Sequence, residues 1–512
     1  VYDTNEKNYY VWKHGRWNED TQDNSYIRSL ISPTLKVYFT QFLIITFKLT
    51  SILTQEDAEY ETNRKLCNKL QDQLILIERT NTINCILKEV KTVLQSKQHS
   101  IKFDITPNLM GFNNKTLDLD HGTFRDIKKT DHISMTTNYD WKEPTEEKTK
   151  QIEDLMEKIF PNPDVRQCYT DVMYSALWGG TKRHFTIANG AGGNGKSLLN
   201  ELLMDSLGDY GYNGHICTLT DKPKSGANPE LANLHKKRLC VFKEPGDKEK
   251  MYMANIKTLV DNKGLNARML YKGNCEVLIF ASIIMECNWR LLFEGKITEG
   301  DRRRLIDLLF ESTFTDNEKY LNDPNRKNTY KCNPQYKQQQ FRDDHRSALI
   351  RYIINYGKSD FTIPPVVVAR TEEYINSNSV IFTWVNDNYE LVLTKGKPDK
   401  THYVRIRDMY DGDEDQYQDT NTFIQSDEYK ALYKKERPTL KEFNDFIEHH
   451  QDLSLYYQSK YQPIIDGKAV CIRKVLMGYR RKVQEKDYKP TPSNDLSQKH
   501  SFPVISLSEL SQ

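Results

Sequence analysis

The stretch IANGAGGNGKSLLNELL, residues 187–203, places four glycines and a Gly-Lys-Ser sequence within one short span. Gly190, Gly195, Lys196 and Ser197 complete the pattern G-x-x-x-x-G-K-[ST], which is typical of a phosphate-binding loop. The short apolar run before the loop predicts a strand, and the apolar spacing after it predicts a helix. The stretch therefore predicts the strand–loop–helix unit that begins a parallel α/β core.

Each residue type in this loop has a physical reason to contact phosphate. Glycines let the backbone turn its N–H groups toward an anion, and the N-terminus of the following helix adds a positive dipole end. Lys196 supplies a mobile positive charge, and Ser197 supplies a hydroxyl for Mg²⁺. The alternative is a glycine-rich turn that contains Lys-Ser by chance, but the flanking pattern favours a nucleoside triphosphate. The residues expected at the nucleotide are Gly190, Gly192, Gly193, Asn194, Gly195, Lys196 and Ser197.

The bulk composition limits the classes of protein to consider. A chain of 512 residues is too long for one core and suggests three or four domains. A net charge of +2 gives no global electrostatic reason to bind nucleic acid, so any such surface must be local. Nine cysteines without C-x-x-C spacing argue against a disulfide framework and a zinc module.

The N-terminal region contains the longest apolar run of the chain, Val37 to Phe47. The run is too short to span a bilayer and is followed by Lys48, so we expect a buried helix or strand and no membrane partner. The N-terminus lacks the pattern of a signal peptide, which argues against secretion. The chain begins at Val1 rather than Met, so we expect a fragment with further sequence upstream.

Changes in composition along the chain predict five segments. Residues 1–150 form a mostly helical N-terminal domain, and residues 151–325 alternate strand, loop and helix as in a parallel α/β domain. Residues 326–388 form a helical connection, and residues 389–490 a mixed C-terminal domain. Residues 491–512 are expected to be a flexible tail.

Two residues after the loop are candidates for the chemistry of hydrolysis. Glu244 follows the apolar residues Leu239 to Phe242, where a carboxylate could coordinate Mg²⁺ and orient the attacking water. Asn288 ends a long apolar strand and could contact the γ-phosphate or the water. The alternatives are a surface glutamate at a strand end and an asparagine that caps a turn.

Two basic segments could contact DNA or a neighbouring subunit. LNARMLYKG and the residues after it predict a basic hairpin, in which the candidate DNA contacts are Arg268, Lys272, Gly273 and Asn274. Arg302, Arg303 and Arg304 precede another apolar strand, and an arginine donated by a neighbour can neutralise transition-state charge. The alternative for these arginines is a solvated basic cluster.

The order of these segments resembles a known family. The phosphate loop, VFKEP, LNARMLYKG, the strand to Asn288 and DRRRLIDLLF resemble the superfamily 3 helicases, a branch of the AAA+ ATPases. Within that branch the chain is similar to the primase-helicases of nucleocytoplasmic large DNA viruses, both poxvirus-like and asfarvirus-like. YYVWKHGRWNED and GFNNKTLDLDHGTF resemble the N-terminal helicase-associated domain of that family. The segment from Ile363 onward resembles its C-terminal part, which ends in a winged-helix-like module.

The resemblance implies a fold, an activity and roles for the site residues. It implies a P-loop core of the AAA+ type and an ATP-dependent DNA helicase, with ATP and Mg²⁺ held by Lys196, Ser197 and the Walker B acid Glu244. Asn288 would be sensor 1, Arg303 or Arg304 the arginine that acts in trans, and Lys272 the hairpin tip. One departure is Lys243, because many family members have two adjacent acids at this position.

The resemblance also implies partners and a location. These are single-stranded and forked DNA, a homo-hexameric ring, an upstream primase domain with other replication proteins, and viral replication sites in the host cytoplasm. A stand-alone P-loop NTPase, an ATP-dependent replication initiator or DNA-binding scaffold, and a DNA-packaging motor are the alternatives. A basic C-terminal stretch could hold duplex DNA or contact a partner, or be a solvated face; its residues are Arg473, Lys474, Arg480, Arg481 and Lys482.

Overall fold

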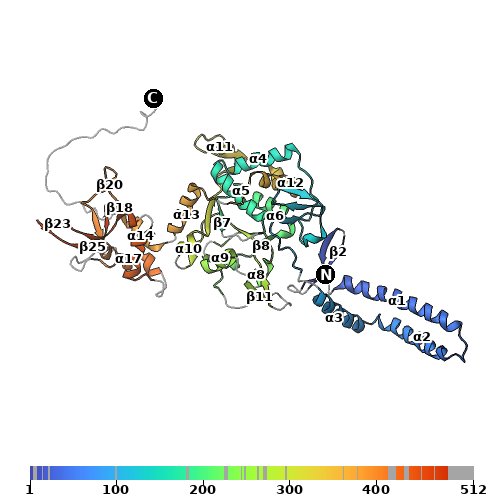
Figure 1. Cartoon of the computed structure of the whole chain (residues 1–512). Coiled ribbons are helices and arrows are strands. Elements are labelled where there is room, and N and C mark those ends of the chain that lie inside the picture. Colours follow the sequence, from blue (N-terminus) through green and yellow to red (C-terminus); the bar gives the residue numbers. More distant parts are fainter. Residues whose placement is uncertain are drawn as a thin grey trace. The chain divides into compact units, whose positions relative to one another are not determined.

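The strand before the phosphate loop lies inside a five-stranded parallel sheet (Figure 1). This strand, β7 (Phe185–Asn189), pairs with β15 (Leu305–Leu309) on one side and with β13 (Ser282–Cys287) on the other. β9 (Leu239–Phe242) and β8 (Gly211–Gly214) complete the order β15-β7-β13-β9-β8. The predicted α/β fold with a parallel sheet is therefore confirmed.

The central strands are buried on both faces. Phe185 and Ile187 of β7 belong to the core on one side of the sheet, whereas Ala188 belongs to the core on the other side. β13 alternates in the same way, with Ile283 on the first side and Ile284 on the second. Helices on both faces explain why these strands read as nearly continuous apolar runs.

Four long helices contribute to the core on the Ala188 side of the sheet. They are α4 (Glu146–Ile159), α5 (Pro163–Leu177), α6 (Lys196–Leu207) and α12 (Gln339–Tyr356). The opposite face packs against shorter segments. These include α7 (Cys217–Thr220), α8 (Pro229–Asn233), α9 (Met253–Val260) and part of α13 (Pro365–Ser377).

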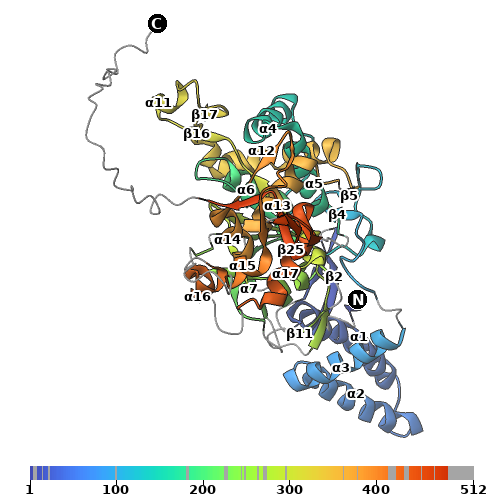
Figure 2. The same ribbon diagram turned by 90° about the vertical axis from the view of Figure 1, so that its left-hand side faces the viewer.

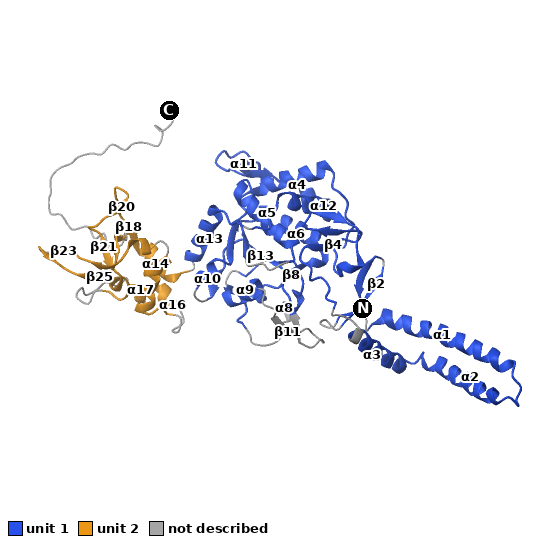
Figure 3. Ribbon diagram, viewed as in Figure 1, with its two compact units in different colours: residues 1–378 blue, residues 379–512 orange. Residues whose placement is uncertain are grey.

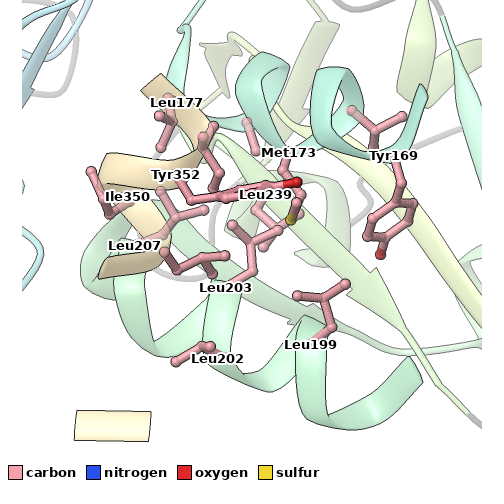
Figure 4. Packing of buried hydrophobic residues seen from close by; sticks show 14 of the residues in the cluster. Tyr169, Met173, Leu177, Leu199, Leu202, Leu203, Leu207, Leu239, Ile350 and Tyr352 are labelled. Carbon is pink, nitrogen blue, oxygen red and sulfur yellow. The ribbon is translucent and has the colours of Figure 1, made fainter. Parts of the chain in front are cut away.

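Helix α6 connects the phosphate loop to the core. Leu199, Leu203 and Leu207 recur at a spacing of four residues, which places them on one face of the helix, and all three are fully buried. In Figure 4 they lie among Leu239 of β9 and Ile350 of α12. The position of the loop is therefore coupled to the centre of the core.

The structure is a computed structural model that describes part of the chain. The described residues are 1–3, 8–13, 15–20, 24–97, 101–179, 184–223, 229–243, 245–246, 249–261, 265–268, 274–294, 297–360, 362–377, 379–412, 422–431, 437–450, 453–465 and 467–482.

The N-terminal region combines small antiparallel sheets with three helices, α1 (Ser25–Ser51), α2 (Ala58–Leu76) and α3 (Thr80–Lys97). α1 packs along α2, and these helices gather beside α3 (Figure 2). Hydrogen bonds from Arg28 to Asn84 and from Tyr9 to the Leu87 carbonyl connect α3 to its neighbours. The sheets consist of β1 (Tyr2–Asp3), β2 (Asn8–Lys13) and β3 (Arg16–Glu19), and of β4 (Leu109–Gly111), β5 (Thr116–Asp118) and β6 (Thr123–Arg125).

The apolar run in α1 is helical, but the prediction that it is buried is wrong. Phe42 and Phe47 are 62% and 66% exposed, and Val37 and Ile45 are also exposed. Among the described residues of α1, only Thr46 is buried. The run from Val37 to Phe47 is by itself too short to span a bilayer, but the 27-residue helix α1 that contains it is long and apolar enough to cross a membrane by length and composition.

The chain divides into two units, Val1–Asn378 and Ser379–Gln512 (Figure 3). The second unit has its own core, in which Trp384, Phe423 and Phe443 are fully buried. Arg480 pairs with Glu390, and Arg473, Lys474 and Arg480 are all exposed. Whether this unit is a winged-helix module stays a prediction.

The second unit contains helices α14 (Val380–Asn388), α15 (Ile406–Tyr410), α16 (Asp427–Ala431) and α17 (Leu440–His449). Its three-stranded antiparallel sheet has the order β21 (Tyr403–Arg405), β25 (Ile472–Met477), β22 (Tyr457–Tyr461). Two-stranded pairs are formed by β18 (Tyr389–Leu391) with β26 (Tyr479–Arg481), β19 (Leu393–Thr394) with β20 (Lys397–Pro398), and β23 (Ile464–Ile465) with β24 (Lys468–Ala469).

Candidate nucleotide site

The phosphate loop lies at the carboxyl end of β7, where the sheet order changes direction. The chain leaves β7 through α6 and continues to β8 at one edge, while β15 lies on the other side of β7. Ligands of open parallel sheets bind outside the carboxyl ends of strands at such a point. The fold thus places the loop where a ligand site is expected.

Two glycines of the loop stand where a side chain would collide. Gly195 has φ 81°, and a Cβ there would lie 2.8 Å from Cγ1 of Ile159. A Cβ at Gly190 would lie 2.2 Å from Nδ2 of Asn194. The backbone can therefore follow this path only with glycine at these positions.

Asn194 holds the loop from inside. Its side chain is buried, with Nδ2 donating to the Phe310 carbonyl at 3.3 Å and Oδ1 accepting from the Lys196 N–H at 3.2 Å. Gly192 and Gly193 are exposed and adjacent to it. Asn194 therefore supports the loop from inside. The two exposed glycines leave the main chain of the loop accessible to a ligand.

The Lys196 ammonium is directed toward the ends of two neighbouring strands. Nζ donates to the carbonyls of Gly190 at 2.9 Å and Cys287 at 3.0 Å, and to Oδ1 of Asn288 at 3.0 Å. Burial lowers the pKa of Lys196, and the nearby Cys287 and Glu286 act in the opposite direction. The structure therefore brings two sequence-predicted residues, Lys196 and Asn288, into direct contact.

Ser197 faces an acid that the sequence analysis missed. Its Oγ donates to Oε2 of Glu286 at 2.9 Å, and Nδ2 of Asn200 donates to Oε1 of the same carboxylate at 3.0 Å. Asn200 in turn accepts a hydrogen bond from the hydroxyl of Tyr169, whose pKa burial raises strongly. The signal available in the sequence was the period of two along a strand, because Glu286 stands two residues before Asn288, which directly follows β13.

The end of β9 presents a lysine rather than an acid among the described residues. Lys243 Nζ lies 3.2 Å from Oε1 of Glu201 on α6, and Glu201 also pairs with Arg342 of α12. The predicted Walker B acid, Glu244, lies outside the described residues, so its position stays a prediction.

The three consecutive arginines differ in their surroundings. Arg304 forms a two-pronged ion pair with Asp261, with distances of 2.7 and 3.0 Å from Nε and Nη2 to the two carboxylate oxygens. Arg302 pairs with Glu372 of α13. Arg303 is exposed, and the described residues include no ion-pair partner for it. Of the two predicted candidates, Arg303 is thus the one whose guanidinium faces solvent.

The predicted hairpin exists as two antiparallel strands, β11 (Leu265–Arg268) and β12 (Asn274–Val277). Arg268 pairs with Asn274 in the register, at the end of the ladder next to the turn. The described residues do not include Lys272 and Gly273. The side chains of Arg268 and Asn274 are likewise not described. Their contact with DNA stays a prediction.

A second charged group behind the loop was not predicted. Asp307 of β15 is fully buried and lies 2.6 Å from Nη2 of Arg290 and 3.2 Å from Nε of Arg370. Arg370 also donates to Oδ1 of Asn189, the last residue of β7, at 3.0 Å. Burial raises the pKa of Asp307, and the two arginines oppose that shift. This group links α13 to the base of the loop.

The donors at the loop fit Mg²⁺ better than a transition metal. Ser197 and Glu286 offer hydroxyl and carboxylate oxygens, the ligand type that Mg²⁺ prefers, and phosphate oxygens of a nucleotide would complete such a site. No group of three or more His, Cys, Asp or Glu side chains in the described part of the chain could hold a metal ion by itself. The cysteines whose side chains the structure describes are free.

Comparisons with known proteins identify relatives in large DNA viruses. The model described as "D5 N terminal like" matches residues 1–161, and a model described as a family of unknown function (DUF5906) matches residues 188–304. The chain is 27% identical to the putative helicase L207/L206 of Acanthamoeba polyphaga mimivirus over 86% of this chain and 45% of that protein. It is 26% identical to primase D5 of Fowlpox virus over 43% of this chain and 29% of that protein.

The comparisons also define how far the likeness extends. The chain spans less than half the length of these relatives. The solved JCV helicase aligns with 69% of this chain and 96% of its own chain, at 13% identity and a TM-score of 0.25. The α/β fold is shown by the five-stranded parallel sheet and by the loop that follows β7.

Proposed function

We propose that this chain belongs with the D5-type proteins of large DNA viruses and is the helicase part of a viral replication protein that hydrolyses ATP to move along DNA and separate its strands. The observation that carries the proposal is the contact of Lys196 with Asn288 beside Ser197 and Glu286 at the carboxyl ends of β7 and β13. The names of the relatives support the reaction class. The site of action would be the viral replication sites of the host cytoplasm.

Each side chain of the site has a role in ATP hydrolysis. The loop N–H groups and the N-terminal end of α6 bind phosphate oxygens, and the Lys196 ammonium neutralises charge on the β- and γ-phosphates. Asn288, held at 3.0 Å from that ammonium, orients the attacking water or the γ-phosphate. Ser197 would hold Mg²⁺ with Glu244, and the ion would neutralise the phosphate charge that develops during transfer.

The transfer step in this proposal needs a neighbouring subunit. Arg303 is exposed on the segment that enters β15 at its amino end, whereas the phosphate loop lies at the carboxyl ends of the strands. An arginine on that edge can reach the nucleotide of the next protomer in a ring and stabilise transition-state charge. Rigid-body motion between protomers would then carry the β11–β12 hairpin along DNA phosphates.

The first experiment measures ATP hydrolysis with and without single-stranded DNA, with particle size recorded in the same buffer. We expect DNA-stimulated turnover by a hexamer-sized species, and a loss of at least a hundredfold in Lys196→Ala. Lys158→Ala is the matched control, because it removes a lysine of α4 that pairs with Asp154 at the surface. Unstimulated turnover by a monomer would contradict the helicase and favour a stand-alone NTPase.

A mixing experiment tests the role of Arg303. Arg303→Ala and Lys196→Ala proteins should each be inactive alone, yet a mixture should recover part of the turnover. Recovery is expected because some interfaces then join an intact Lys196 in one protomer to an intact Arg303 in the next. Turnover that stays at background in mixed rings, or an Arg303→Ala protein as active as wild type, would remove Arg303 from this role.

Arg304→Ala is the control for that experiment. It breaks the ion pair with Asp261, so its main effect should be a lower unfolding temperature rather than a loss that mixing restores.

A further inference from the structure

Glu286 is a buried acid directed at the hydroxyl that the proposed function assigns to Mg²⁺. It is 4% exposed, and both carboxylate oxygens accept hydrogen bonds, one from Ser197 and one from Asn200. Its strand, β13, lies between β7 and β9, and Glu286 pairs in register with Ala188 of β7. The acid is therefore fixed by the sheet rather than by a loop.

A structural tie between β13 and α6 does not need a charge. Burying a carboxylate is costly unless it is paired and hydrogen-bonded, and a neutral amide of similar shape could bond to Ser197 or Asn200 at lower cost. The two groups that donate to Glu286 are neutral, and the ammonium of Lys196 interacts with its charge while donating its own hydrogen bonds to other groups. The charge at this position is thus better explained by a cationic ligand than by packing.

The described end of the neighbouring strand β9 offers a cation at this edge of the sheet rather than an acid. Lys243 follows β9, and its ammonium is directed to Glu201 of α6. Glu286 comes from the adjacent strand and already contacts the Ser197 hydroxyl.

We infer that Glu286 is an acid of the metal site, which positions Mg²⁺ through the hydroxyl of Ser197. The inference rests on the proposed function, because it assumes that the loop binds a nucleotide with Mg²⁺. Glu286 is a positioning residue: it orients the ligand oxygen of Ser197 and adds negative charge next to the cation. Acidic partners of ligand side chains typically change metal affinity by about 10- to 100-fold.

The test compares Glu286→Gln with wild type in the full chain, using the fluorescence of a mant-labelled ATP as the probe of binding. Binding is measured in EDTA and during a titration with MgCl2, and thermal unfolding is recorded without nucleotide. We expect the Mg²⁺ concentration at half-saturation to rise about 10- to 100-fold. Affinity in EDTA should be unchanged or tighter, because the substitution removes a negative charge beside the triphosphate.

Two further variants make the result specific. Glu201→Gln is the matched control, since it neutralises a glutamate of α6 that pairs with Lys243 and Arg342, and it should leave the Mg²⁺ midpoint within twofold of wild type. Glu286→Asp keeps the charge and should give a midpoint between those of wild type and Glu286→Gln. If Glu286→Gln does not fold, the shift in Glu286→Asp decides the question in the same way.

The outcomes separate this inference from the proposed function. A Glu286→Gln protein with the wild-type Mg²⁺ midpoint, or with equal losses in EDTA and in Mg²⁺, would show that Glu286 has only a structural role. A wild-type chain that binds no mant-ATP in either buffer would overturn the proposed function itself.

Discussion

Helices α6 and α1 are both rich in apolar residues, but the apolar side chains of α6 are buried and those of α1 are exposed. The leucines of α6 at positions 199, 203 and 207 are fully buried against the sheet and α12, and its first two residues belong to the phosphate loop. α1 presents Phe42 and Phe47 to solvent along a helix more than twice as long.

The difference shows that apolar content does not by itself place a helix in a core. α6 begins at the carboxyl end of a central strand, so the chain must cross one face of the sheet, and burial follows from that connection. α1 is flanked by the small β1–β3 sheet and by α2, and neither covers its apolar length. The surface that lies opposite each helix, rather than its composition, decides between the two outcomes.

The largest expected effect in this comparison is on the buried helix. Leu203→Ala removes a fully buried side chain from the interface of α6 with the sheet and α12, and should lower the free energy of unfolding by about 2–5 kcal/mol. Urea unfolding of wild type and variant measures this difference. A loss below about 1 kcal/mol would mean that the core can close around the gap, and that α6 is held less tightly than its burial indicates.

The smallest expected effect is on the exposed helix. Phe42→Ala removes a larger side chain than Leu203→Ala, but from a site that is 62% exposed, so the free energy of unfolding should change by no more than about 0.5 kcal/mol. The measurement is repeated at two protein concentrations a hundredfold apart. A larger loss that appears only at the higher concentration would show that another copy of the chain covers α1.

The nucleotide loop could be predicted because its chemistry is contiguous in sequence. The requirement for glycines, a lysine and a hydroxyl is met within eight residues, and the flanking strand and helix follow the ordinary periodicities. Asn288 was found because it ends an apolar strand, and the parallel register of β13 with β7 brings it to Lys196.

The residues that were missed depend on pairings between distant segments. Glu286 contacts Ser197 because of the register of β13 against β7 and the position of α6. Neither can be predicted from the residues next to Glu286 in the sequence. The three arginines are alike in sequence, and Asp261 and Glu372, which distinguish two of them, lie about 40 and 70 residues away. The prediction that the apolar run of α1 is buried was wrong because its eleven residues do not indicate which surface will pack against them.

The contacts of Lys196 have a consequence for the entropy of binding. A lysine side chain that becomes fixed loses on the order of 1.5–2 kcal/mol of rotamer freedom. Here two main-chain carbonyls and the amide of Asn288 already define the ammonium position, so that loss occurs when the chain folds and not when a phosphate arrives. The site is preorganised, and a ligand that exchanges these neutral oxygens for phosphate oxygens gains charge pairing without having to order the side chain.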